Sequence, residues 1–310
     1  MTYTRGDVLT GSMAALLCAT TGTAAAQSSQ LNIAAGQIAP QGEAFFAADA
    51  GFFQKQGINP VLNVFRNGAA NAAAVAGGDM QIGVSTVLQL GQAHVHGIPF
   101  VILAAGAVHD SKYVNAGLLV PSGSPITNAK ELTGRVVGSS SLNGLDELSI
   151  RTLVDKAGGD SSHVKFTELP PESQFAALLQ GRVDAVNMQD PSRQAALDSG
   201  KVHMIAIGDD AIGPVFVQTA WFTTTTWLAA NKDVAKRFAA AIFEAGDWAM
   251  RNPSQAADVL TKYLKTAPIP TNQRYASKLN LLDFQVVLDA AVKYKMLPAI
   301  SAAGFVWDGN

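Results

Sequence analysis

Apolar residues along positions 31–106 form short strand-like runs that alternate with stretches of helical spacing. The strand-like runs lie at 31–35, 60–65, 81–84 and 98–106, and helical spacing marks 42–54, an alanine-rich run after Gly68, and 85–96. Such alternation is typical of βαβ units, so it predicts a mainly parallel sheet with helices on both faces. A second round begins at Leu118, with strand-like runs at 136–138, 164–169, 185–186 and 202–207, and it ends in an extended segment at Phe222.

Two stretches in different halves of the chain share one pattern. FRNGAANAAAVAGGDMQIGVSTV at 65–87 and SQFAALLQGRVDAVNMQD at 173–190 each give small or aliphatic helix formers, then a glycine, an acid and a β-type run. The small residues predict a helix that lies close against a sheet, and Gly77-Gly78 predicts a left-handed turn, which glycine adopts at little cost. Two matching units in one chain predict two similar lobes.

The last part of the chain is mainly helical. Helical spacing runs through 234–248 to a stop at Asn252-Pro253 and recurs at 256–263 and 283–294. We expect this tail to pack back on the first lobe, so that the chain crosses between lobes twice, near 109–117 and 215–222. Two crossings form a hinge, whose rotation we expect at 114–117 and 219–221. The predicted division is lobe I at 27–112, lobe II at 113–218, and the second, helical part of lobe I at 219–310.

Residues 1–26 have the features of a signal peptide. Arg5 supplies a positive n-region, 9–21 is mostly apolar but too short to span a bilayer, and 24–26 is an Ala-Ala-Ala cleavage site. Gly6 after Arg5 disfavours a twin-arginine signal, and Leu17 is too large to precede a lipid-bearing Cys18. We therefore expect cleavage before Gln27 and residence in the periplasm.

Composition narrows the classes of function. The 310 residues are 48% apolar and 15% charged with a formal net charge of −2, a globular composition that lacks the basic runs of nucleic-acid or membrane binders. Cys18 is the only cysteine, so the mature chain would have no disulfide and no thiol nucleophile. His94 and His96 point apart on a helix and have no third ligand at metal spacing. No nucleophile elbow, P-loop or dinucleotide fingerprint follows a strand, so we expect no catalytic residue, no metal and no cofactor.

Polar residues at the strand ends are the candidate ligand-binding residues. In an open parallel sheet, a ligand lies beyond the carboxyl ends of the strands, where helices begin and their amides are free. The candidates are Gln37, Gln41, Asn67, Ser85 and Thr86 in lobe I, Ser141, Asn143, Gln189 and Asp190 in lobe II, and Trp221 at a crossing as an apolar wall. Ser85 and Thr86 are expected to donate together to one acceptor. Asp190 either accepts from a ligand or forms the turn before Pro191.

Several short motifs occur in order along 31–260. They are Phe45-Phe46-Ala47 through Gly51-Phe52-Phe53-Gln54-Lys55-Gln56-Gly57, Gly78-Asp79-Met80-Gln81-Ile82-Gly83, Glu131-Leu132-Thr133-Gly134-Arg135-Val136, Leu178 through Ala185, and Asp190-Pro191. This series resembles the solute-binding proteins of ABC importers, in the branch of alkanesulfonate, taurine, nitrate and thiamine-pyrimidine binders. The resemblance implies an α/β, two-lobe periplasmic binding protein of type II-like fold, which is not an enzyme. Such a protein captures a small organic solute in the cleft between its lobes and delivers it to a permease complex at the inner membrane.

The ligand and the exact role stay open. Arg66 could pair with a carboxylate or sulfonate, and Trp221 could face an aromatic or heterocyclic ring. A sensory protein that presents its ligand to a receptor would use the same lobes. An enzyme of the pyrimidine-synthesis type shares the fold, but that group uses a cysteine-rich iron site, and a mature chain without cysteine argues against it. We expect the protein to be a monomer.

Overall fold

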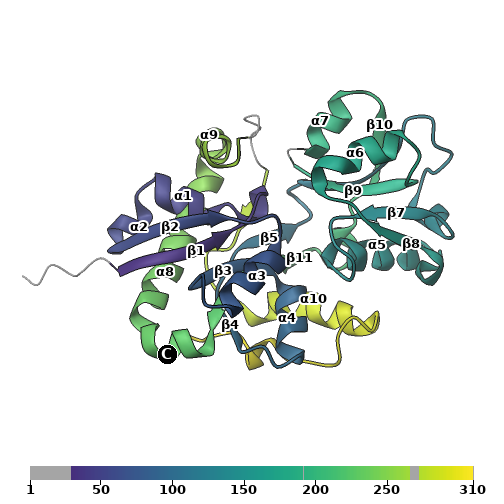
Figure 1. Cartoon of the computed structure of the whole chain (residues 1–310). Helices are drawn as coiled ribbons and strands as arrows, with labels where there is room; N and C mark the ends of the chain where they lie inside the picture. The colour runs from purple at the N-terminus through teal and green to yellow at the C-terminus, as the bar shows by residue number, and fades with distance from the viewer. Residues whose placement is uncertain (1–28, 191, 266–271, 310) are drawn as a thin grey trace, which may run out of the picture.

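The computed structural model describes residues 29–190, 192–265 and 272–309, and it contains two sheet-bearing lobes (Figure 1). The first lobe has a five-stranded sheet in the order β2-β1-β3-β12-β4. Its strands are β1 (Ser29–Ala35), β2 (Ile58–Val64), β3 (Ile82–Thr86), β4 (Phe100–Ala105) and β12 (Thr219–Thr224). Strand β12 is antiparallel to both of its neighbours, while β1, β2 and β3 pair in parallel, so four strands share one direction. The sheet is mainly parallel, as the alternating pattern predicts.

Helices cover both faces of this first sheet. The helices of one face are α1 (Glu43–Asp49), α2 (Phe52–Lys55), α8 (Thr225–Arg251) and α9 (Pro253–Leu264), and those of the other are α3 (Gly68–Ala76), α4 (Val87–Val95) and α10 (Leu281–Lys293). The alternation along β12 shows the two faces, because Trp221 packs in the core under α8 and the next residue, Phe222, packs in the core under α10. The single helix expected over 42–54 is two helices, because Gly51 has a left-handed backbone with φ of 81°.

The second lobe repeats this architecture on a smaller scale. Its sheet has the order β10-β6-β9-β7-β8, formed by β6 (Ala116–Pro121), β7 (Val136–Ser139), β8 (Lys165–Glu168), β9 (Ala185–Gln189) and β10 (Val202–Ala206). Only β6 among these strands runs against its neighbours. Helix α5 (Leu145–Lys156) covers one face, and α6 (Pro171–Leu179) and α7 (Ser192–Asp198) cover the other.

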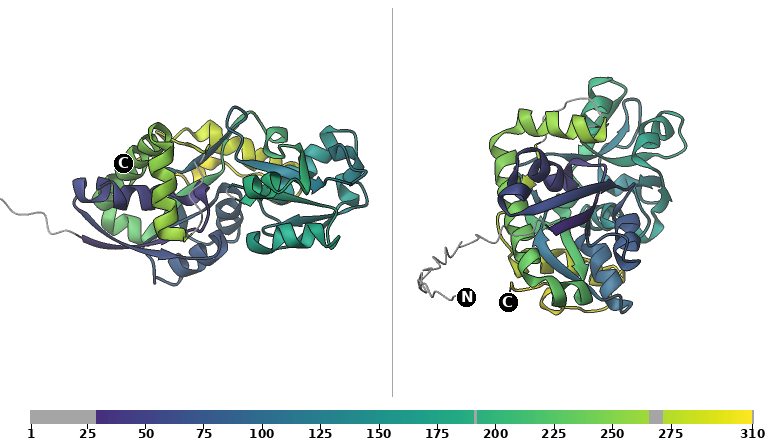
Figure 2. Two further views of the ribbon diagram at one scale, coloured as in Figure 1. Left: turned by 90° about the horizontal axis from the view of Figure 1, so that it is seen from above. Right: turned by 60° about the vertical axis from the view of Figure 1, so that its left-hand side comes forward.

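A third, small sheet joins the lobes. Strands β5 (Ala107–Asp110) and β11 (Val215–Val217) carry the chain out to the second lobe and back, and they pair antiparallel in the register Val215 with Asp110. Strand β13 (Arg274–Tyr275), in the returning tail, adds to the other edge of β5. Figure 2 shows the two lobes on either side of this junction. The chain therefore passes between the lobes at two places that lie next to each other.

Small residues let α3 lie close to the first sheet. A Cβ atom on Gly83 of β3 would lie 2.9 Å from Cγ2 of Val75 and 3.1 Å from the ring of Phe222, so only glycine fits under this helix. Asn71, on the inner face of α3, is fully buried and donates from Nδ2 to the backbone oxygen of Val84 at 2.7 Å. The alanine-rich helix is thus held by close packing and by one buried polar contact that the sequence pattern does not reveal.

Replacing Asn71 tests this contact. Asn71→Ala is expected to lower the free energy of unfolding by about 1–3 kcal/mol, because the buried carbonyl of Val84 loses a donor. The matched control is Asn63→Ala, since Asn63 makes only an exposed contact at 3.4 Å with Val61, and a change within about 0.5 kcal/mol is expected there. Urea denaturation measures both variants. Equal effects at the two positions would contradict the assigned role.

Candidate functional site

The carboxyl edges of both sheets lie at the junction between the lobes. In the first lobe, β4 runs from its carboxyl end at Ala105 through Gly106 directly into the crossing strand β5. In the second lobe, the carboxyl end of β10 at Ala206 leads through a short 3-10 turn to the returning strand β11. Because the other parallel strands point the same way as these two, all of their carboxyl ends lie on the side where the lobes are joined. Ligands of open α/β sheets bind at such edges, and this zone is the candidate site.

Asn67 and Thr86 cap the helices that begin at this edge of the first lobe. The Asn67 side chain accepts from the amide of Ala70 at 2.9 Å at the start of α3, and the Thr86 hydroxyl accepts from the amide of Gln89 at 3.3 Å at the start of α4. Each oxygen therefore already satisfies one free helix amide. Removing the Thr86 hydroxyl should therefore destabilise the unliganded protein.

Ser85 is completely buried and bonded within the first lobe. Its hydroxyl donates to Oε1 of Gln89 at 2.8 Å, and the Thr86 hydroxyl lies 3.2 Å from the same oxygen. Gly68, at the start of α3, is packed against it, because a Cβ there would lie 2.5 Å from the Ser85 hydroxyl. The structure thus brings the starts of α3 and α4 together at the end of β3, with Gln89 as the common acceptor of both hydroxyls.

The two glutamines after β1 differ in exposure. Gln37 is exposed, whereas Gln41 is buried, with its side chain lying over Gly36, where a Cβ atom would have no room. Gln37 can therefore meet a solute directly, while Gln41 lies beneath the surface of the same loop.

In the second lobe, the loop after β7 is fixed by the acids of α5. Asn143 has a left-handed backbone with φ of 53°, and its amide donates to Glu147 at 2.8 Å. Asp146 accepts from the amide and hydroxyl of Ser140, and from Asn187 Nδ2 at 3.0 Å. Ser141 contributes its backbone oxygen, which accepts from Ser139 at 2.8 Å. The acids are thus satisfied by the loop that precedes their helix and, for Asp146, also by Asn187 of β9.

One candidate residue of this loop reaches the first lobe. The backbone oxygen of Asn143 accepts from Nε2 of Gln92, on α4, at 3.0 Å. Asn143 therefore contacts α4, the helix that begins directly after Ser85 and Thr86, although the two segments lie far apart in the sequence.

Asp190 is paired with an arginine. Its two carboxylate oxygens accept from Nε and Nη2 of Arg193 at 3.0 and 3.1 Å, and both side chains are buried. Burial raises the pKa of Asp190, and the attraction of Arg193 opposes that rise. Asp190 therefore does not present the free, unpaired carboxylate that was expected to accept a hydrogen bond from a ligand. Gln189, the last residue of β9, is half-buried beside it.

Trp221 lies in the hydrophobic core and is 0% exposed. Its ring packs edge-on against Phe238 of α8, with centroids 5.6 Å apart, on the face of the sheet that α1 and α8 cover. The prediction that Trp221 forms an apolar wall at the crossing is therefore wrong, because the pleat of β12 turns its side chain into the core.

A buried polar cluster that was not predicted from the sequence lies where the lobes join. Asp209 accepts from Ser149 of α5 and from Nε2 of Gln218 at 2.7 Å, and Nδ1 of His109 lies 4.0 Å from it. The other ring nitrogen of His109 lies 2.9 Å from Asp210. Burial raises the pKa of Asp209, while His109 acts in the opposite direction. These contacts link α5 of the second lobe to both crossing strands.

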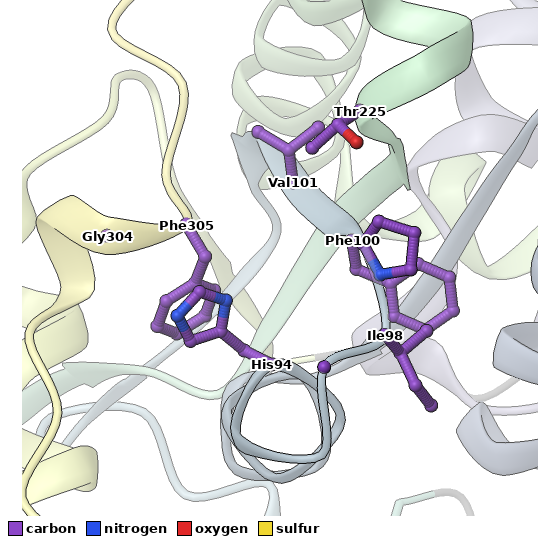
Figure 3. A pocket seen from close by; sticks show the side chains of 9 residues that line it. His94, Ile98, Phe100, Val101, Thr225, Gly304 and Phe305 are labelled. Atoms are coloured by element: carbon purple, nitrogen blue, oxygen red, sulfur yellow. The ribbon is translucent and has the colours of Figure 1, made fainter.

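A surface recess of about 230 Å³ lies elsewhere, among His94, Phe100, Thr225 and Phe305 (Figure 3). It adjoins Phe100, the first residue of β4, and therefore lies at the amino edge of the first sheet, opposite to the candidate site. The ring of His94 stacks on Phe305 at 4.9 Å, and this fills one side of the recess.

Among the described residues, no group of three His, Cys, Asp or Glu side chains is placed to hold a metal ion. In the same part of the chain, each helix is too short or too polar to cross a bilayer.

Comparisons with known proteins place this architecture. A protein of Brucella abortus, named provisionally as a binding protein, is 24% identical over 221 residues, which are 71% of this chain and 66% of that protein, just under two thirds of its length. The periplasmic aliphatic sulphonate-binding protein SsuA of Escherichia coli has a similar structure, with a TM-score of 0.71 at 19% identity over 90% of this chain and 92% of SsuA. The periplasmic nitrate-binding protein NrtA of Synechocystis PCC 6803 gives a TM-score of 0.73 at 13% identity over 90% of this chain and 86% of NrtA.

An enzyme shares the same fold. The desulfurization enzyme DszB gives a TM-score of 0.65 at 14% identity, over 89% of this chain and 95% of DszB. At such identities the structural likeness establishes the fold alone. Residues 42–256, more than half of the chain, match the family described as NMT1/THI5 like. The chain therefore belongs to the NMT1/THI5-like family.

Proposed function

We propose that the protein is an extracytoplasmic solute-binding protein, which captures a small organic solute between its lobes and delivers it to the permease of an ABC importer. One observation carries the proposal: the carboxyl edges of two mainly parallel sheets lie at a single pair of crossing strands. A solute held there would touch both lobes at once. The likeness to SsuA and NrtA, which are named for binding sulphonate and nitrate, supports this role.

Capture would involve closure about the crossings. A solute stabilises the closed form only if that form adds contacts from the second lobe. We place the rotation at 114–117, which leads into the start of β6, and at 219–221, the first residues of β12. The rigid bodies would be residues 27–112 with 219–310, and residues 113–218.

The solute would be met by polar groups from both lobes. We assign Gln37, Gln41, Asn67, Ser85 and Thr86 to one side, and Ser141, Asn143, Gln189 and Asp190 to the other. Asp190 is paired with Arg193, Asn67 and Thr86 cap helices, and the Ser85 and Thr86 hydroxyls donate to Gln89. These groups would therefore bind through remaining lone pairs and nearby free amides, and the two hydroxyls would turn from Gln89 to the solute. Such a set suits a solute with several acceptors, and sulfonates, carboxylates and heterocycles all qualify.

Two other functions use the same fold. A sensory protein would present the solute to a receptor, and neighbouring permease and ATPase genes would favour import over this role. An enzyme has a structural parallel in DszB; product formation from a bound solute would favour it. The periplasm follows as the proposed location, with the signal peptide at 1–26 removed and a monomer released.

A thermal-shift screen tests solute binding most broadly. Sulfonates, aromatic acids, pyrimidines and nitrate are added one at a time to the mature chain. A true solute at a concentration of about 100 Kd should stabilise the fold by roughly 2.7 kcal/mol, because it binds the folded form alone. If no member of these classes raises the melting temperature, the proposed solute chemistry is wrong.

A paired variant tests where the identified solute binds. Ser85→Ala with Thr86→Val should weaken binding about tenfold or more, because each lost hydrogen bond to a buried solute costs roughly 1–3 kcal/mol. It should also lower the stability of the unliganded protein by about 0.5–2 kcal/mol through the lost cap of α4. The control is Thr86→Ser, which keeps the capping oxygen and should preserve both properties. Calorimetry that finds unchanged affinity in the paired variant would exclude this site.

A further inference from the structure

Glu43, the first residue of α1, carries a buried carboxyl group. The residue is 1% exposed, and within the described part of the chain neither of its carboxylate oxygens makes a hydrogen bond. Buried carboxyl groups are usually bonded or paired, so this one needs an explanation. None of the roles assigned above uses it.

The carboxyl group lies where both crossing strands meet the first lobe. A Cβ atom on Gly106, between β4 and β5, would lie 2.8 Å from Oε1 of Glu43 and 2.7 Å from the hydroxyl of Thr219. Thr219 is the first residue of β12 and is separated from the returning strand β11 by Gln218 alone. Gly106 is therefore required here, because the space that its side chain would take is filled by these two groups.

The residues around the carboxyl group are tied to the backbone of the junction. The Thr219 hydroxyl donates to the oxygen of Pro40 at 2.9 Å and accepts from the amide of Ala107 at 2.8 Å. The hydroxyl of Tyr275, on β13, donates to the oxygen of Ala39 at 2.7 Å. Each of these hydroxyls is thus already engaged, which leaves the carboxyl group without them.

The surroundings favour the neutral form of Glu43. Thr219, the indole of Trp221 and Tyr275 face it from β12 and β13, and these groups carry no charge at neutral pH. Burial raises the pKa of Glu43 to about 8, and the lowering effects of its own backbone amide and of the Trp221 indole only partly offset this. Burial, together with the nearby Glu43, also raises the pKa of Tyr275, so the phenol stays protonated in the same range.

Burial of a neutral acid has a definite effect on stability. An acid whose pKa is higher in the folded state holds its proton more tightly there than in the unfolded chain. Its stabilising contribution is complete below the ordinary value of 4.5 and is lost as the pH rises to about 8. Above that range Glu43 is ionised in the folded protein, and its charge requires water in a junction that is packed dry around the neutral form.

We propose that Glu43 is a proton-controlled positioning residue of the junction between the lobes. In its neutral form it fills the space between α1 and the two crossing strands and fixes Gly106 and Thr219 in place. In its ionised form it draws water into this space and loosens the relative placement of the lobes. This inference goes beyond the proposed function and does not depend on the identity of the solute.

Tryptophan fluorescence tests the protonation directly, because the Trp221 indole faces the carboxyl group. The wild-type emission should show a step with a midpoint near pH 8, and Glu43→Gln, a neutral variant of the same shape, should lack that step. Trp221→Phe should remove it as well, which assigns the signal. Glu172→Gln changes an exposed carboxyl group of α6 and should keep the step. A step that survives in Glu43→Gln, or no wild-type step, overturns the proposal.

A distance measurement tests the effect on the lobes. The protein used begins at Gln27 and therefore lacks Cys18. Spin labels are attached to Gln54→Cys in the first lobe and Lys156→Cys in the second, both at exposed positions, and they report the distance between the lobes. The distribution of distances in the otherwise wild-type chain should broaden between about pH 6 and about pH 9, across the raised pKa. The added Glu43→Gln change should abolish the broadening, while Glu172→Gln should not. Identical distributions at both pH values in the wild type, beside an intact fluorescence step, would show that Glu43 titrates without acting on the junction.

Discussion

The whole architecture depends on the pairing of two short strands, β5 and β11, which lie side by side where the lobes meet. Both passages of the chain between lobes go through this ribbon, so the lobes have one joint instead of two separate linkers. The ribbon leaves each sheet at its carboxyl edge, and that connection brings the free helix starts of both lobes to one side. A solute site between lobes follows from this connectivity more than from any single residue.

The residues at that site are already well satisfied before any solute arrives. Asn67 and Thr86 cap their own helices, Asp146 and Glu147 hold the loop after β7, and Asp190 is paired with Arg193. Such prior bonding fixes the proposed binding groups in place, which would reduce the ordering that a solute must impose. It also leaves little uncompensated charge at the candidate site. We therefore expect a solute to be recognised by directed hydrogen bonds more than by a strong electrostatic field. The buried cluster around Asp209 and His109 extends this prior bonding to the joint itself, whereas Glu43 lies there without a hydrogen bond and is favoured in its neutral form.

The order of elements and the two-lobe organisation could be predicted from the sequence because hydrophobic periodicity is local. The strand and helix runs from Leu31 to Phe222 correspond to observed elements, and the departures are local too, such as the left-handed Gly51 that divides one expected helix into two. The direction of a side chain relative to a sheet was harder to predict. Trp221 sits at the crossing, as expected, but the pleat of β12 points it into the core.

The polar contacts could not be predicted from the sequence, for a different reason. His109 meets Asp210 only because the outgoing and returning parts of the chain lie side by side, and Glu43 lies over Gly106 only because the fold brings α1 to the end of β4. No spacing along the sequence encodes such meetings. A side-chain oxygen at a helix start also looks the same in a sequence whether it caps the helix or binds a solute, and this is why Asn67 and Thr86 could be located but not assigned.

Small-angle scattering with a verified solute tests the central claim, that the lobes close on a solute about the paired crossings. The account predicts a smaller radius of gyration at saturating solute, and no change with an analogue that fails to stabilise the protein in thermal unfolding. A solute that stabilises the protein but leaves the scattering curve of the free form unchanged would contradict closure between the lobes.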